Sequence, residues 1–158
     1  MEWRERQITS DRSIGDTVEV ILSVSHLNED HAALKRILDP TRWRIQEAVC
    51  CGAAFRTLDY RPVPAIITNA TLPDGDWTHV LRYAQAQPQP PNVIVASHFA
   101  DDRFWAEVMN LGGYDVLIKP FEAEEVRRVV SLACPLHARG GSPIHSSVCV
   151  NFARSAAA

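Results

Sequence analysis

Polar residues close several short apolar runs in this sequence, and that arrangement places side chains at one edge of a sheet. Asn69 closes one run, Ser97 a second and Lys119 a third. If the runs are parallel strands, these residues meet at the carboxyl edge, where open α/β sheets keep their binding sites. An ammonium, a hydroxyl and an amide can hold the oxygen atoms of an anion such as a phosphoryl group. The pattern therefore raises the question of phosphoryl chemistry.

The elements that must position these residues alternate regularly along the chain. β-Branched and apolar runs predict strands, and helical spacing of apolar residues between them predicts helices. The expected strands are 18–25, 43–48, 64–68, 92–97 and 114–118, and the expected helices are 28–38, 50–58, 77–84, 101–111 and 122–134. This alternation predicts an α/β fold, a doubly wound five-stranded parallel sheet with right-handed crossovers and helices on both faces.

The chain divides into one domain with two terminal segments. Residues 1–17 are polar and mixed in charge, which predicts a flexible leader, and residues 18–136 form the predicted domain. Residues 137–158 are interpreted as a C-terminal tail, too short for a second domain. Within it, Ser147–Phe152 has the composition of a strand and could either add a strand or dock on a partner.

Composition narrows the functional classes. The 158 residues carry a formal charge of -3 and a pI near 6.0, which gives no overall electrostatic reason to bind nucleic acid or an anionic membrane. No apolar run approaches the roughly 20 residues needed to cross a bilayer, and the first residues lack the apolar core of a secretory signal. We therefore expect a cytoplasmic protein.

Three landmarks in this order make the chain resemble a response-regulator receiver domain of two-component signalling. They are Leu72-Pro-Asp-Gly75 after the third predicted strand, Ser97 at the end of the fourth, and Lys119-Pro120-Phe121 after the fifth. The resemblance runs from Val18 to about Cys134. It implies a flavodoxin-like receiver fold with strand order 2-1-3-4-5 and a role in phosphorelay signal transduction.

The resemblance also implies which positions matter. Active receivers hold Mg²⁺ on an acidic pair after the first strand and accept a phosphoryl group on an aspartate at the end of the third. They hold the phosphoryl oxygens with a Ser or Thr after the fourth strand and a lysine after the fifth. In this chain Ser25 and His26 stand at the acidic-pair positions and Asn69 at the acceptor position, whereas Ser97 and Lys119 match the pattern.

The substitutions change the expected chemistry. With no carboxylate, one lysine and one histidine at these positions, the crevice is expected to be net positive and to repel Mg²⁺, which prefers anionic oxygen ligands. An amide is also a poor nucleophile for forming an acyl phosphate. Val116 stands where active receivers usually carry an aromatic switch residue. We therefore predict no phosphotransfer, no enzyme activity, no Mg²⁺ or other cofactor and no metal site.

Two expectations concern the lysine and the nearby acids. Lys119 should point to water, to the Asn69 amide oxygen or to a bound anion. Glu29 and Asp30 are interpreted as residues that favour the start of the first helix through its dipole, not as replacements for the missing pair. Two hypotheses remain open for the crevice. It is either a small anion pocket built from Lys119, Ser97 and Asn69, or an empty remnant.

The sequence therefore predicts an atypical receiver that acts in signal transduction through protein–protein contact without aspartyl phosphorylation. The alternative is a phosphorelay receiver that is still phosphorylated at a non-standard residue with a divalent metal. The expected partner is a protein such as a histidine kinase or another regulator, and a homodimer is a further expectation from the family. Trp105 and Tyr114 are the interface candidates. A flavin binder is disfavoured because residues 25–30 lack the required glycine-rich loop.

Overall fold

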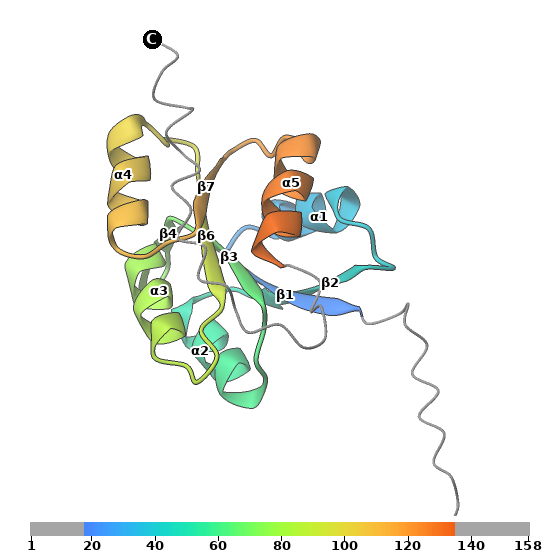
Figure 1. The fold of residues 1–158 in the computed structure, drawn as a ribbon, viewed down its shortest axis with the longest axis horizontal. Coiled ribbons are helices and arrows are strands. Elements are labelled where there is room, and N and C mark those ends of the chain that lie inside the picture. Colours follow the sequence, from blue (N-terminus) through green and yellow to red (C-terminus); the bar gives the residue numbers. More distant parts are fainter. Residues whose placement is uncertain (1–17, 135–158) are drawn as a thin grey trace, which may run out of the picture.

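A five-stranded parallel sheet forms the middle layer of the computed structural model, which describes residues 18–134 (Figure 1). The strand order is β2-β1-β3-β6-β7, which is the predicted 2-1-3-4-5 order when only the strands of this sheet are counted. The strands are β1 (Glu19–Val24), β2 (Trp43–Ala48), β3 (Ala65–Asn69), β6 (Asn92–Ser97) and β7 (Asp115–Ile118). The predicted fold class is confirmed.

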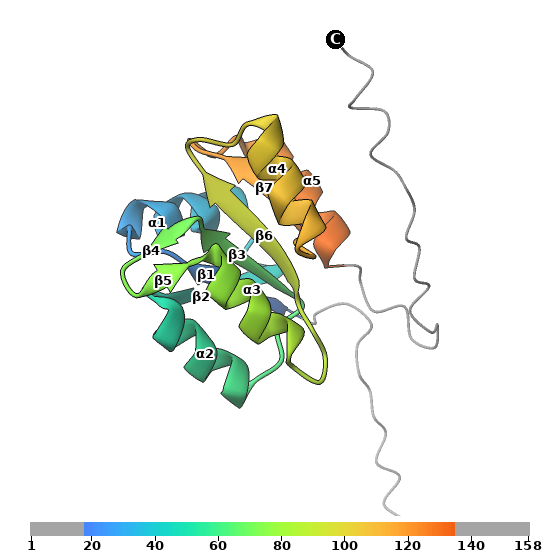
Figure 2. The same cartoon turned by 90° about the vertical axis from the view of Figure 1, so that its left-hand side faces the viewer.

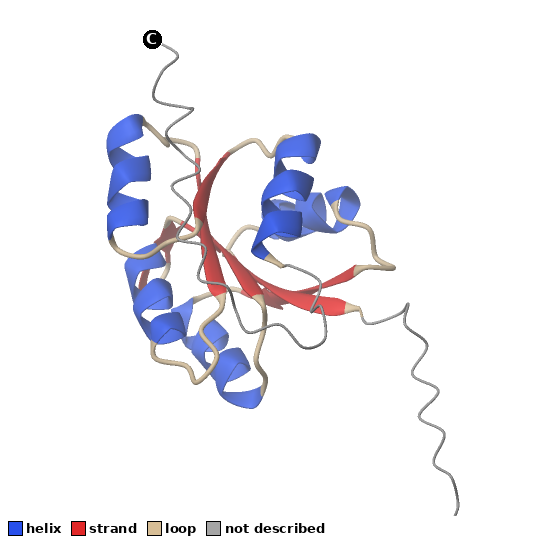
Figure 3. Ribbon diagram, in the orientation of Figure 1, coloured by secondary structure: helices blue, strands red, loops and turns tan. Residues whose placement is uncertain are grey.

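Helices cover both faces of the sheet, so the strands lie between two helical layers (Figure 2 and Figure 3). One face carries α1 (Asn28–Ile37) and α5 (Ala123–Ala133), and the other carries α2 (Cys51–Tyr60), α3 (Trp77–Gln85) and α4 (Asp102–Asn110). Each face has its own apolar core cluster. Ile67 of β3 belongs to the cluster under α1 and α5, and Ile66 belongs to the cluster under α2, α3 and α4, as expected for a strand that is buried on both sides.

A short hairpin between β3 and α3 is an element that the sequence did not predict. Its strands are β4 (Thr71–Leu72) and β5 (Gly75–Asp76), which pair antiparallel around the Pro73-Asp74 turn. Asp74 fixes the hairpin to α2, because its two carboxylate oxygens accept the N–H groups of Cys51 at 2.8 Å and Gly52 at 3.0 Å. The hairpin contains the Leu72-Pro-Asp-Gly75 stretch that follows the third strand of the main sheet.

The helix ends follow local chemistry with one exception. Asp101 and Asp76 accept backbone N–H groups at the starts of α4 and α3. Gly112, with φ of +100°, follows the end of α4, which is the backbone conformation that favours glycine. The exception is α1, where Leu27 occupies the cap position and no side chain makes a capping hydrogen bond.

The predicted leader 1–17 and tail 137–158 lie outside the described residues. None of the helices in residues 18–134 is both long enough and apolar enough to cross a membrane.

Candidate functional site

The predicted site residues do converge on the carboxyl edge of the sheet. Ser25 follows β1, Asn69 ends β3, Ser97 ends β6, and Lys119 follows β7. Backbone bonds hold the strand ends together: the Lys119 N–H donates to the Ser97 carbonyl at 2.9 Å, and the Ala70 N–H donates to the Ala96 carbonyl at 2.9 Å. The strand ends that carry Asn69, Ser97 and Lys119 are therefore held side by side at this edge.

Lys119 does not point to water, to Asn69 or to an open anion site, and the expectation for its side chain is wrong. Its Nζ atom lies 2.6 Å from Oδ2 of Asp30, and the two side chains are 3% and 10% exposed. Asp30 comes from the first turn of α1, so the interpretation of this acid as a helix-start residue only is also wrong. The ion pair joins α1 to the end of β7, and its two residues lie 89 positions apart in the sequence.

Ser25 completes this buried group. Its hydroxyl donates to the same Oδ2 atom of Asp30 at 2.6 Å and accepts the N–H of Leu27 at 3.1 Å. Asp30 Oδ2 thus receives both an ammonium and a hydroxyl, which is the pattern that stabilises a charged carboxylate away from water. The position where active receivers carry one of the paired acids holds a hydrogen-bond donor in this chain.

The imidazole of His31 makes hydrogen bonds with Ser25 and Ser23 and so helps to fix the position of Ser25. The imidazole is 2% exposed, with Nε2 lying 2.9 Å from the Ser25 carbonyl and Nδ1 2.8 Å from the Ser23 hydroxyl. A carbonyl only accepts, so Nε2 carries a proton, and the Ser23 hydroxyl can donate to Nδ1. The buried polar groups of β1 and α1 therefore form one connected chain that ends on the Asp30–Lys119 pair.

The prediction that the carboxyl edge carries a net positive charge is wrong. Asp30 supplies a carboxylate that neutralises Lys119, so the buried pair carries no net charge. A signal for this was present in the sequence, because Asp30 stands four residues before Leu34 and eight before Leu38, on the inward side of the helix. Glu29, one position earlier, is exposed and faces away.

Asn69, Ser97 and His26 make no hydrogen bond with the Asp30–Lys119 pair. The Asn69 side chain is half-buried, and its Oδ1 atom accepts the N–H of Ala70 at 3.2 Å, while the Ser97 hydroxyl accepts the N–H of Phe99 at 3.1 Å. His26 is exposed. Within residues 18–134 no group of three or more His, Cys, Asp or Glu side chains is placed to hold a metal ion.

Trp105 and Tyr114 both lie on the α4–β7–α5 side of the molecule and are partly buried. Trp105 Nε1 lies 3.4 Å from the Asp115 carboxylate, and burial raises the pKa of the Tyr114 hydroxyl above its ordinary value. Exposed apolar side chains accompany them on the same elements: Leu111, Ile118 and Leu132. Both aromatic residues thus pack against the core, on elements that also carry exposed apolar side chains.

Comparisons with known proteins agree with this architecture. Residues 21–131 match the family model of the response regulator receiver domain. No curated protein matches the sequence. The signal receiver domain of a putative LuxO repressor from Vibrio parahaemolyticus superposes with a TM-score of 0.69 and 20% identity, covering 75% of this chain and 91% of that one.

Two further solved structures extend the likeness. The chemotaxis response regulator CheY4 of Vibrio cholerae has a TM-score of 0.68 at 15% identity, covering 74% of this chain and 99% of that one. The receiver domain of the sensor histidine kinase PA1611 from Pseudomonas aeruginosa PAO1 has a TM-score of 0.64 at 21% identity, covering 75% and 98%. In that protein a magnesium ion is coordinated in the active-site cleft. At these identities the likeness concerns the fold.

Proposed function

Because the chain belongs to the response regulator receiver domain family, we propose that it is a signalling module that acts through protein–protein contact without aspartyl phosphorylation. One observation carries the proposal. The lysine that would hold a phosphoryl oxygen is already paired with Asp30 at 2.6 Å, while the acceptor position is occupied by Asn69. The module is therefore proposed to have no enzyme activity and no Mg²⁺ requirement.

The electrostatics of the crevice support this proposal. A hard divalent cation needs oxygen ligands with negative charge, and Ser25, His26 and Asn69 supply no carboxylate. The carboxylate of Asp30 is engaged by Lys119 and by the Ser25 hydroxyl on one oxygen atom. A metal ion would have to separate a buried ion pair and leave an ammonium without its partner, which is costly. The same pairing argues against the anion pocket, because the Lys119 charge is already neutralised.

The test is to offer the full chain a phosphodonor. We expect that acetyl phosphate with Mg²⁺ leaves its mass unchanged and that beryllofluoride with Mg²⁺ shifts no amide resonance at the carboxyl edge of the sheet. A gain of about 80 Da, the mass of one phosphoryl group, would overturn the proposal.

A matched variant shows whether the substituted residues are the cause. Ser25→Asp, His26→Asp and Asn69→Asp together restore the acidic residues that active receivers carry, and Asp30→Asn in the same chain releases Lys119 from its ion pair. We expect this quadruple variant to bind Mg²⁺ and to accept beryllofluoride. Circular dichroism checks that the variant is folded. If the folded variant does not bind Mg²⁺, the substituted residues are not the cause.

The Asp30 carboxylate also favours one specific form of the alternative function. Its Oδ2 atom faces Lys119, so a receiver phosphorylated at a non-standard residue would carry the phosphoryl group on Asp30. Comparison of the wild type with Asp30→Asn separates the two functions. A mass gain in the wild type that Asp30→Asn abolishes establishes the alternative, and the absence of any gain in the wild type supports the proposal above.

The proposed contact surface is the α4–β7–α5 side with Trp105 and Tyr114. Its exposed apolar residues, Leu111 at 49%, Ile118 at 52% and Leu132 at 60%, give it the composition of a protein interface. We propose a protein partner such as a histidine kinase or another regulator, with a homodimer through the same surface and a cytoplasmic location. Sedimentation of the full chain with and without a candidate kinase measures both contacts.

A further inference from the structure

The backbone pattern of β2 leaves hydrogen-bonding groups at the edge of the sheet. The Glu19 N–H donates to the Arg42 carbonyl at 3.0 Å, and the Ser25 N–H donates to the Ala48 carbonyl at 2.9 Å. Because backbone groups alternate sides along a strand, the even-numbered residues of β2 face β1 and the odd-numbered residues face outward. β2 is an edge strand in the part of the chain that the structure describes.

The outward groups of β2 are only partly used. The Trp43 N–H donates to the Asp39 carbonyl at 2.9 Å in the turn before the strand. The N–H groups of Ile45 and Glu47 have no hydrogen-bond partner among residues 18–134. These two amides form a short pairing edge of the kind that an added strand satisfies.

We propose that Ser147–Phe152 of the same chain pairs with this outer edge of β2 as a sixth parallel strand. The segment reads Ser-Val-Cys-Val-Asn-Phe and has the same six-residue length as β2. Its Val148, Val150 and Phe152 alternate with polar or small residues, which is the pattern of a strand with one apolar face. This pairing is independent of the function proposed above.

The two faces of β2 match that alternation. Trp43 and Ile45 belong to the core cluster under α1 and α5, whereas Arg44 and Gln46 on the opposite face are exposed. An added strand with its valines and phenylalanine beside Trp43 and Ile45 extends the apolar layer. Its serine, cysteine and asparagine then lie beside the exposed Arg44 and Gln46.

The handedness of the crossovers selects β2 over the other edge strand, β7. The β1-α1-β2 unit moves toward the β2 edge with its helix on the α1/α5 face. A connection from β7 through α5 to a strand outside β2 moves in the same direction on the same face, so it has the same right hand. A strand added outside β7 after α5 would give a left-handed crossover, which is very rare.

The chain also leaves α5 close to the correct end of β2. Cys134, which follows α5, lies in the same core cluster as Trp43, and Glu19 and Arg42 are close enough to influence its thiol, whose pKa burial raises to about 12. Residues 135–146 can span roughly 40 Å when extended, several times the roughly 5 Å spacing between neighbouring strands.

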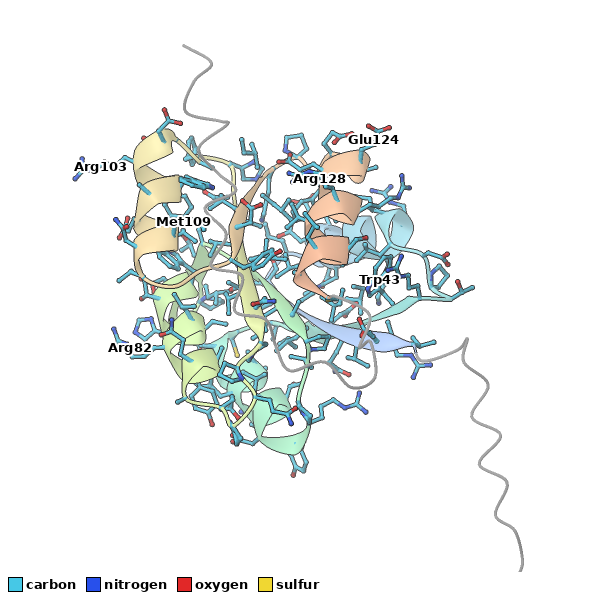
Figure 4. The ribbon with its side chains drawn as sticks, in the orientation of Figure 1. Trp43, Arg82, Arg103, Met109, Glu124 and Arg128 are labelled. Carbon is cyan, nitrogen blue, oxygen red and sulfur yellow. The ribbon has the colours of Figure 1, made fainter. Side chains whose placement is uncertain are left out.

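The indole of Trp43 is a second sign that this corner is incomplete in residues 18–134. Trp43 is 6% exposed, and its Nε1–H group is buried without a hydrogen-bond partner in the described part of the chain. Figure 4 shows this side chain near the start of β2, below α1 and α5. Buried N–H groups are rarely left unpaired, so this donor supports the proposal that a further segment packs at this corner.

Amide hydrogen exchange of the full chain, followed by NMR, tests the pairing. We expect the Ile45 and Glu47 amides to exchange slowly in the wild type. Replacing adjacent residues by Cys149→Pro and Val150→Pro removes an N–H in either register and should speed their exchange by at least about tenfold. The matched control places two prolines beyond the segment, Ala156→Pro and Ala157→Pro, and should leave both amides protected.

Three results would overturn the proposal. The first is rapid exchange of Ile45 and Glu47 in the wild type, and the second is protection that survives the Cys149→Pro and Val150→Pro pair. The third is protection that rises with protein concentration together with a dimeric sedimentation coefficient, because the paired strand would then come from a second copy and not from the same chain.

Discussion

At the scale of single residues, the main feature of the candidate site is the buried ion pair between Asp30 and Lys119. Asp30 and Lys119 are nearly inaccessible to solvent, and Ser25 adds a hydrogen bond to the same carboxylate oxygen. Removal of one member of a buried pair leaves an uncompensated charge in a poorly solvated place, whereas removal of both does not. The two side chains should therefore be strongly coupled in folding.

A double-mutant cycle measures that coupling. We expect Asp30→Ala and Lys119→Met each to lower the free energy of unfolding by about 3–5 kcal/mol. The double variant should lose clearly less than the sum of the two losses, because neither charge is then left alone. Urea denaturation gives the four free energies, and additive losses would contradict the pairing.

The titration of Asp74 should change the free energy of unfolding with pH. The N–H groups of Gly52 and Cys51 lower the pKa of its carboxyl to about 2, from an ordinary value of 3.8. Because the folded pKa is depressed, the contribution of Asp74 to stability is fully present above about pH 4 and is lost as the pH falls toward 2.

The corresponding variant is Asp74→Asn, compared with Thr71→Ala on the same hairpin. The asparagine variant should be less stable than the wild type at pH 6, and the difference between them should shrink as the pH falls toward 2. Urea midpoints measured along this pH range check the expectation. A difference that stays constant with pH would show that the carboxylate charge does not contribute.

At the scale of elements, the strands and helices follow closely from apolar periodicity, and the strand Asn92–Ser97 has the bounds that the sequence predicts. What the sequence did not reveal depends on contacts between distant segments. Asp74 of the β4–β5 hairpin accepts a hydrogen bond from the start of α2. Asp30 of α1 pairs with Lys119, which follows β7. Apolar periodicity indicates which side of a helix or strand is buried. It does not indicate which polar residue of a neighbouring element will contact that side.

The end of α4 offers a test at this scale. Gly112 has φ of +100°, and a Cβ atom there would run into the amide of Gln85, which itself donates to the Leu111 carbonyl. Gly112→Ala should cost about 1–3 kcal/mol of unfolding free energy. The control is Gly52→Ala in α2, where the nearest atom to the new methyl group lies 3.6 Å away, and it should be neutral or slightly stabilising.

At the scale of the whole molecule, the carboxyl edge of the sheet differs in character from the α4–β7–α5 side. The carboxyl edge carries a neutral, closed ion pair, and the α4–β7–α5 side carries the exposed apolar residues that suit a partner. The sequence predicted that Ser25, Asn69, Ser97 and Lys119 lie at the carboxyl edge of the sheet, which the structure shows. It did not predict the charge of the crevice, because that depends on a residue outside the positions that active receivers use.

The surface prediction is tested by the oligomeric state. We expect Leu132→Glu to weaken self-association of the full chain, because it places a charge in the apolar surface of α5. Tyr60→Glu is the matched control, since Tyr60 is 90% exposed at the end of α2, on another side of the molecule. Sedimentation velocity over a range of concentrations distinguishes them, and equal behaviour of both variants would place the contact elsewhere.

The Asp30–Lys119 pair also restricts how this domain could change over generations. An aspartate at position 69 would put a second carboxylate near the Asp30–Lys119 pair, in competition for one ammonium, while positions 25 and 26 carry no carboxylate that could help to bind a compensating metal ion. The substitution Asn69→Asp alone is therefore unfavourable, and it would need carboxylates at positions 25 and 26 beside it.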